Sequence, residues 1–269
     1  MTIDPKNRVA NPKCYAAQLG GCSAQISNEH YISDAILRLV SEDKRSVLVR
    51  NLTFQRRNIL EPKGISSLVA KVLCVNHNSE LSRFDIAGLE MFDAMDQIDS
   101  AAGEYGSSPI PIHVNGDDFE RWMLKALCGG LFSGNLPVAG KSHKAVNPPM
   151  EWIKILCVSA RFPTGCGLYV RAGTPGVVFE TEPSVFRVAA EFDADNRVVG
   201  FKVLIFNFEF LLLLAPVQAD RMATLQHCVY RPSALNFQGA DGSHRKIQFQ
   251  WRDGSTDELQ VVCLGNPTP

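Results

Sequence analysis

The hydrophobic and polar positions divide the chain into a helical first half and a strand-rich second half. In the first half, apolar residues return every three or four positions, which predicts amphipathic helices over 64–75, 78–98 and 119–131. Residues 46–54 alternate between apolar and polar and are rich in β-branched side chains, which predicts a strand. The first half is therefore expected to be mainly helical, with a strand inserted early.

After a stretch rich in Gly, Pro and Asn at 132–149, the pattern changes to short apolar runs separated by turn signals. These runs predict the strands of an antiparallel sheet or sandwich: WIKILCVSA, CGLYVRA, GVVFETE, FRVAAEFD, RVVGFKVLIFNFEFLLLL, KIQFQWRD and LQVVCL. The expected fold class is α+β. An N-terminal domain with packing helices would cover 1–149, and a mainly antiparallel β-rich domain, whose role the sequence leaves open, would cover 150–269.

The composition is that of a folded protein, with 45% hydrophobic and 20% charged residues. The N-terminal residues lack the apolar run of a secretory peptide. The most apolar segment, 201–216, contains Lys202 and Glu209 and is shorter than the roughly 20 residues that span a bilayer. We therefore expect a cytoplasmic protein without a membrane partner, in which this segment forms a buried strand.

The eight cysteines of an intracellular chain are expected to stay reduced, as metal ligands or core thiols. A structural zinc takes four Cys or His ligands, supplied as two pairs. Cys14 and Cys22 can form one pair, and Cys74 with His77 has the two-residue gap of a zinc knuckle. The alternative is that these are ordinary buried thiols and a surface histidine. The other cysteines are expected to be core thiols: Cys128, Cys157, Cys166, Cys228 and Cys263.

Further polar residues follow each of the two pairs. Glu29 and His30 come after the first pair, and Asn78 comes directly after the second. The stretches CYAAQLGGCSAQISNEHYIS and LCVNHNSELSRFDIAG resemble the zinc-bearing subtype of the HNH, or ββα-metal (His-Me finger), endonuclease family over about residues 14–92. The resemblance implies a treble-clef-like nuclease domain, held together by a structural Zn²⁺ that is bound by the Cys14/Cys22 pair and the Cys74/His77 pair.

The resemblance also implies roles for the other polar residues. Glu29 and Asn78 would hold a catalytic Mg²⁺ or Mn²⁺, because their oxygen atoms suit such ions. His30 would be the general base, since a neutral imidazole can accept a proton from water. Asn51, with Asn58 as its competitor, would orient this base. The alternative for Asn51 is an ordinary turn or edge-strand residue.

A local basic patch would bind the phosphates of the substrate through Arg50, Arg56 and Arg57. The alternative interpretation of this patch is a solvated hairpin face.

The resemblance suggests a DNA endonuclease with an anti-phage or restriction role. The β domain could bind a protein partner or form the interface of a homo-oligomer. Two rival readings stay open: a noncatalytic zinc-containing module that binds nucleic acid or a partner, and a ligand-binding β sandwich with the zinc unit as its cap.

Overall fold

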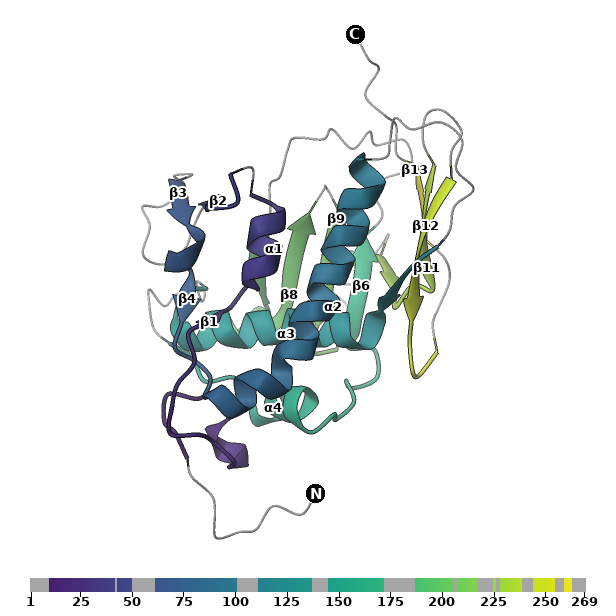
Figure 1. The fold of residues 1–269 in the computed structure, drawn as a ribbon. Helices are drawn as coiled ribbons and strands as arrows, with labels where there is room; N and C mark the ends of the chain where they lie inside the picture. Colours follow the sequence, from purple (N-terminus) through teal and green to yellow (C-terminus); the bar gives the residue numbers. More distant parts are fainter. Residues whose placement is uncertain are drawn as a thin grey trace. The chain divides into compact units, whose positions relative to one another are not determined.

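The computed structural model describes residues 10–41, 43–49, 61–100, 111–136, 145–171, 187–205, 208–216, 225, 228–238, 244–254 and 259–262. The fold is mixed α+β, as expected (Figure 1). The chain separates into two compact units. Unit 1 consists of Met1–Leu89, Arg121–Phe162 and Phe192–Val198, and unit 2 of Glu90–Glu120, Pro163–Glu191 and Val199–Pro269. The domain boundary expected near residue 150 stays a prediction.

Unit 1 combines short strands with helices. It contains the turn η2 (Ala17–Leu19), β1 (Glu29–His30), α1 (Asp34–Leu39), β2 (Ser46–Val49), β3 (Glu61–Gly64), the turn η3 (Ile65–Ser67), β4 (Val69–Ala70), the start of α2 (Val75–Ser100), most of α3 (Gly116–Ser133) and α4 (Met150–Cys157). Strand β1 pairs antiparallel with β4, and β2 pairs antiparallel with β3. In Figure 1 the β1–β4 pair leads directly into the start of α2.

Two of the expected elements of this unit are wrong. The helix expected over 64–75 is replaced by η3 and β4, because backbone groups at Val72 and Leu73 bond to the N-terminal segment instead of to a helical turn. The strand expected from Trp152 onward is helix α4. Its apolar residues are buried at helical spacing, on one face: Trp152, Ile153, Ile155 and Leu156. A short apolar run suits either element, so periodicity alone cannot decide between them.

The two long helices agree with the sequence pattern. Helix α2 covers the expected 78–98 and α3 covers 119–131, each with additional residues at both ends. Where they belong to unit 1, the two helices approach closely at Gly88. A Cβ atom there would lie 2.7 Å from Cγ of Trp122, whose side chain is fully buried. The absence of a side chain at Gly88 thus permits this helix contact.

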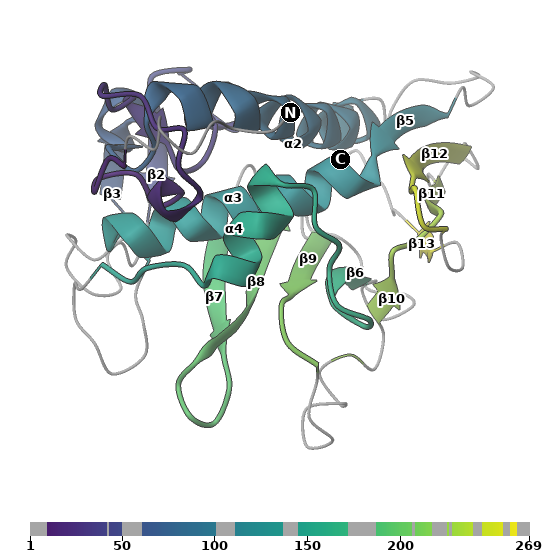
Figure 2. The ribbon, with the colours of Figure 1, turned by 90° about the horizontal axis from the view of Figure 1, so that it is seen from below.

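Unit 2 contains two sheets, which form separate groups of strands in Figure 2. The first has the order β10 (Cys228–Tyr230), β6 (Gly167–Arg171), β9 (Phe208–Leu213), β8 (Val198–Ile205) and β7 (Arg187–Phe192). The second has the order β13 (Leu259–Val262), β11 (Ala234–Gln238), β12 (His244–Gln250) and β5 (Ile112–Asn115). Within the apolar segment 201–216, residues 201–205 therefore belong to β8 and residues 208–213 to the neighbouring strand β9, instead of to one strand.

The register of these sheets corrects one part of the expected topology. Strands β6, β8, β9 and β10 pair antiparallel, as expected. The second sheet is mixed, because β11 pairs parallel with β13 and β12 pairs parallel with β5. Strand β5 precedes α3 in the sequence, so this sheet joins segments far apart in the chain. The expected strand GVVFETE lies outside the described residues.

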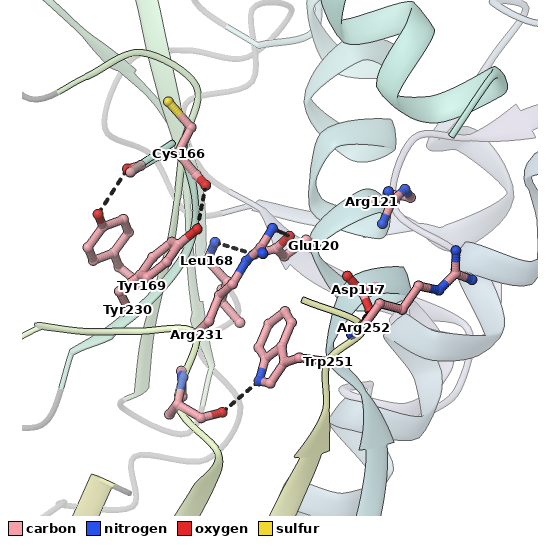
Figure 3. Close-up of polar contacts among 12 residues, drawn as sticks. Asp117, Glu120, Arg121, Cys166, Leu168, Tyr169, Tyr230, Arg231, Trp251 and Arg252 are labelled. Carbon is pink, nitrogen blue, oxygen red and sulfur yellow. Dashed lines mark hydrogen bonds and ion pairs between the residues drawn. The ribbon is translucent and has the colours of Figure 1, made fainter. Parts of the chain in front are cut away.

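A buried ion pair connects α3 with the strand-rich part of unit 2 (Figure 3). The Glu120 carboxylate accepts hydrogen bonds from Nε and Nη2 of Arg231 at 2.8 and 2.9 Å, and from the N–H of Leu168 at 2.7 Å. The Arg231 guanidinium lies 5.4 Å from the ring centroids of both Tyr230 and Trp251. Burial raises the pKa of Glu120, and Arg231 opposes that shift. Through these contacts, the Glu120–Arg231 pair joins segments of unit 2 that lie far apart in the sequence.

Within the described residues, no helix combines the length and the apolar character that crossing a bilayer requires.

The close approach at Gly88 can be tested by substitution. We expect Gly88→Val to lower the free energy of unfolding by about 1–3 kcal/mol, because the new side chain would overlap the Trp122 ring. Ile86→Val is the matched control on the same helix, since Ile86 is 58% exposed. The control should change stability by less than about 0.5 kcal/mol. Equal denaturation midpoints for the two variants would contradict this account of the contact.

Candidate functional site

Backbone hydrogen bonds join the N-terminal segment to the residues just before α2 and to the first residue of that helix. Three of these bonds, at 2.9, 2.9 and 3.0 Å, run from N–H to carbonyl: Tyr15 to Val72, Ser27 to Leu73 and Val75 to Gln25. Gly20 and Gly21 have φ angles of 78° and 74°, a left-handed conformation that favours glycine. These glycines turn the chain back between its first two cysteines.

This pairing brings four potential metal ligands together: Cys14, Cys22, Cys74 and His77. All four are buried, and their ligand atoms lie within 4.8 Å of one another. Nδ1 of His77 is 3.4, 3.7 and 3.3 Å from the three Sγ atoms, in chain order. In a tetrahedral zinc site, with bonds of about 2.3 Å to sulfur and 2.0 Å to nitrogen, sulfur and nitrogen lie about 3.5 Å apart. The cluster can therefore hold a metal such as zinc.

The thiols of this cluster differ in how readily they ionise. Burial raises the pKa of Cys14 to about 12 and also raises that of Cys22. Burial acts on Cys74 in the same direction, but backbone hydrogen bonds at His77 and Ser23 outweigh it and lower the Cys74 pKa. Because Cys74 immediately precedes α2, the positive end of the helix dipole also favours a thiolate there. A bound divalent cation would shift all three thiols toward the thiolate.

A second polar cluster lies in the same unit, around Lys125 of α3. The ammonium Nζ of Lys125 lies 2.6 Å from Oε1 of Glu29 and also contacts Oδ2 of Asp85. The side chains of Lys125 and Glu29 are only 4% and 8% exposed. Ser33 donates to Asp85 at 2.6 Å, and the indole N–H of Trp122 donates to Ser33 at 3.2 Å. Glu29 is therefore held by a network from several elements.

Asn78 lies beside this network, in the first turn of α2. Burial raises the pKa of Glu29, whereas Lys125 and a hydrogen bond with the Asn78 side chain oppose that shift. The amide oxygen Oδ1 of Asn78 is buried and has no hydrogen-bond partner among the described residues. The structure thus brings Glu29 and Asn78 together, with one buried oxygen atom left unsatisfied.

His30 follows Glu29 in β1 but belongs to a separate set of contacts. Its Nε2 lies 3.1 Å from the carbonyl oxygen of Ile65 and 3.8 Å from Oδ1 of Asp34. A carbonyl oxygen only accepts, so Nε2 must carry the hydrogen of this bond. In the neutral imidazole, Nδ1 is then free to accept a proton. A hydrogen bond from Arg38 holds the pKa of Asp34 below its ordinary value.

Four of the predicted site residues lie outside the described part of the chain. They are Asn51, the expected orienting residue, and the basic residues Arg50, Arg56 and Arg57; Asn58, the competitor of Asn51, lies there as well. The predicted roles of these residues remain predictions. Among the described residues, the carbonyl of Ile65 is hydrogen-bonded to His30.

Sequence reasoning missed Lys125 and Asp85. A signal for Lys125 was present, because a lone lysine lies within the apolar pattern FERWMLKALC, where a solvated charge would not be expected. No comparable signal marked Asp85, which lies among other acidic residues of α2. Of the cysteines expected in the core, Cys128 and Cys166 are buried, Cys157 and Cys228 are half-buried, and Cys263 lies outside the described residues.

In comparisons with known proteins, the chain matches no family model, and no curated protein or solved structure is significantly similar to it.

The metal cluster can be tested by elemental analysis combined with thermal unfolding. We expect the purified chain to carry about one zinc ion. Cys74→Ser and His77→Ala should lose the metal and lower the melting temperature, and a strong chelator should have the same effect on the wild type. Cys228→Ser, which changes a half-buried thiol of unit 2, should retain the metal. Wild-type protein without bound zinc would contradict the assignment.

Proposed function

We propose that this chain is a metal-dependent endonuclease of the HNH type, which hydrolyses phosphodiester bonds in DNA. The contact of His30 with the Ile65 carbonyl carries the proposal. It leaves Nδ1 of the neutral imidazole as the proton acceptor, which is the form that a general base requires. Because β1 carries His30 and pairs with β4 shortly before α2 begins, the order β1, β4, α2 also supports a ββα-metal unit.

Zinc on the four-residue cluster has a structural role in this proposal. Cys74 and His77 flank the first residues of α2, so an ion on the cluster would hold the start of this helix against the N-terminal segment. Asn78 follows His77 directly and would be positioned by the same ion. The cluster offers four protein ligands, which is typical of structural zinc sites, whereas a catalytic site keeps one position open.

The residues expected to hold a second, catalytic ion have suitable chemistry. Glu29 offers a carboxylate, and Asn78 offers the buried amide oxygen that has no partner among the described residues. Mg²⁺ and Mn²⁺ prefer such oxygen ligands. A divalent ion bound there would supply positive charge for the phosphate and the leaving oxygen.

The chain's own groups account for the remaining steps. His30 would accept a proton at Nδ1 from the attacking water, and the Ile65 carbonyl would hold the ring in place during this transfer. Asp34, kept anionic by Arg38, lies on the Nε2 side of the ring and would favour the imidazolium that results. Arg50, Arg56 and Arg57 would bind flanking phosphates. An anti-phage or restriction role is what the family resemblance suggests for such a nuclease.

One observation favours a second candidate, a noncatalytic zinc-containing module that binds nucleic acid or a protein partner. The carboxylate of Glu29 is buried and already paired with the Lys125 ammonium, so it is less available to a divalent ion than an open carboxylate. In this candidate, His30 serves only as a structural link between β1 and Ile65. The two candidates differ in whether His30 is needed for cleavage.

The general base can be tested by plasmid cleavage with zinc-loaded protein and added Mg²⁺. We expect His30→Ala to lower the cleavage rate by about 100- to 10,000-fold, because proton transfer to a positioned base contributes a factor of this size. His113→Ala, which removes an exposed histidine of β5, should leave the rate unchanged. Cleavage by His30→Ala at the wild-type rate, or none by the wild type, would favour the noncatalytic module.

A further inference from the structure

The Lys125 ammonium occupies a position between two carboxylates that come from different parts of the chain. It contacts Glu29 of β1 at 2.6 Å and also contacts Asp85 of α2. Asp85 is fixed from the other side by the hydroxyl of Ser33, which in turn accepts from Trp122. All of these residues belong to unit 1. The ammonium is therefore held in place on both sides.

The charges of this network do not cancel. One ammonium group faces two carboxylates, so the group would keep a formal charge of −1 with all three side chains ionised. The Asn78 amide group donates to the Glu29 carboxylate, and its own oxygen Oδ1 is buried without a partner among the described residues. A net negative charge and an unpaired amide oxygen on neighbouring side chains form an environment that attracts a cation.

A purely structural ion pair explains this arrangement less well. Buried ion pairs add little net stability, because the loss of hydration offsets the attraction of the charges. Such a pair is also expected to satisfy the polar atoms around it, since each unsatisfied buried group is unfavourable. Here the side chain of Asn78, which donates to Glu29, keeps a buried oxygen without a partner among the described residues, and a purely structural ion pair does not account for that oxygen.

We propose that Lys125 is the resident cation of this site and competes with a divalent ion for Glu29. That Glu29 and Asn78 are the ligands of the divalent ion rests on the proposed function. Lys125 acts through Glu29 and is thus a positioning residue. In the protein without a divalent ion, the Lys125 ammonium neutralises the Glu29 carboxylate and holds it in position. Asp85 provides a second carboxylate that retains Lys125 when Glu29 is released.

The competition makes a prediction about ion binding that does not depend on cleavage. Mn²⁺ is a suitable probe, because the free ion is measured directly by electron paramagnetic resonance. We expect Lys125→Met, in zinc-loaded protein, to bind Mn²⁺ at least about tenfold more tightly than the wild type, since a positive charge in contact with the ligand is removed. Lys154→Met, which changes an exposed lysine of α4, is the matched control and should match the wild type.

A double variant tests whether the gained affinity involves Glu29. Glu29→Gln combined with Lys125→Met replaces the ion pair by two neutral side chains and should return Mn²⁺ binding to the wild-type level or below. Mn²⁺ should raise the melting temperature of Lys125→Met and leave that of the double variant unchanged. Lys125→Gln, which keeps a polar side chain of similar length, serves as a second single variant if Lys125→Met folds poorly.

Two results would overturn the proposal. One is a Lys125→Met or Lys125→Gln protein that binds Mn²⁺ no more tightly than the wild type. The other is a failure of Mn²⁺ to stabilise either variant against unfolding. A wild type that does not cleave plasmid DNA would count against the nuclease and leave the Mn²⁺ comparison intact. Conversely, equal Mn²⁺ affinities combined with His30-dependent cleavage would reject the competition alone.

Discussion

The structure of unit 1 depends on the convergence of three thiols and one imidazole from two separate segments. Cys14 and Cys22 flank a glycine turn, and Cys74 and His77 flank the start of α2. Their ligand atoms lie within 4.8 Å of one another in a buried position, which penalises ionised thiols unless a cation is present. A metal ion on these ligands would tie the N-terminal segment to α2 at the point where both enter the core.

The position of the cluster has consequences for the polar residues nearby. Asn78 belongs to the same helical turn as His77, and Glu29 belongs to the strand that the N-terminal segment leads into. Movement of the cluster would therefore move both proposed ligands of the catalytic ion together. Lys125 of α3 further restricts the position of Glu29, because its ammonium pairs with the Glu29 carboxylate. The proposed activity and the proposed competition are thus both properties of one buried region.

The sequence pattern predicted some elements well and others poorly, for identifiable reasons. Helices α2 and α3 have apolar positions that repeat over several turns, so their pattern identified them. Helix α4 and strand β4 are too short for periodicity to distinguish helix from strand. Strand β5 depends on parallel pairing with β12, which lies much later in the chain. A pairing of this kind has no local pattern and was missed.

For the candidate site, the sequence by itself predicted the four potential metal ligands, because the spacing within each pair is a local feature, whereas the meeting of the two pairs is shown by the tertiary structure. It also placed Glu29 and His30 together, and Asn78 beside His77. Only the tertiary structure showed that Lys125 pairs with Glu29 and that His30 contacts the Ile65 carbonyl. These contacts join side chains and backbone groups from distant segments, and their formation depends on how the helices and strands pack.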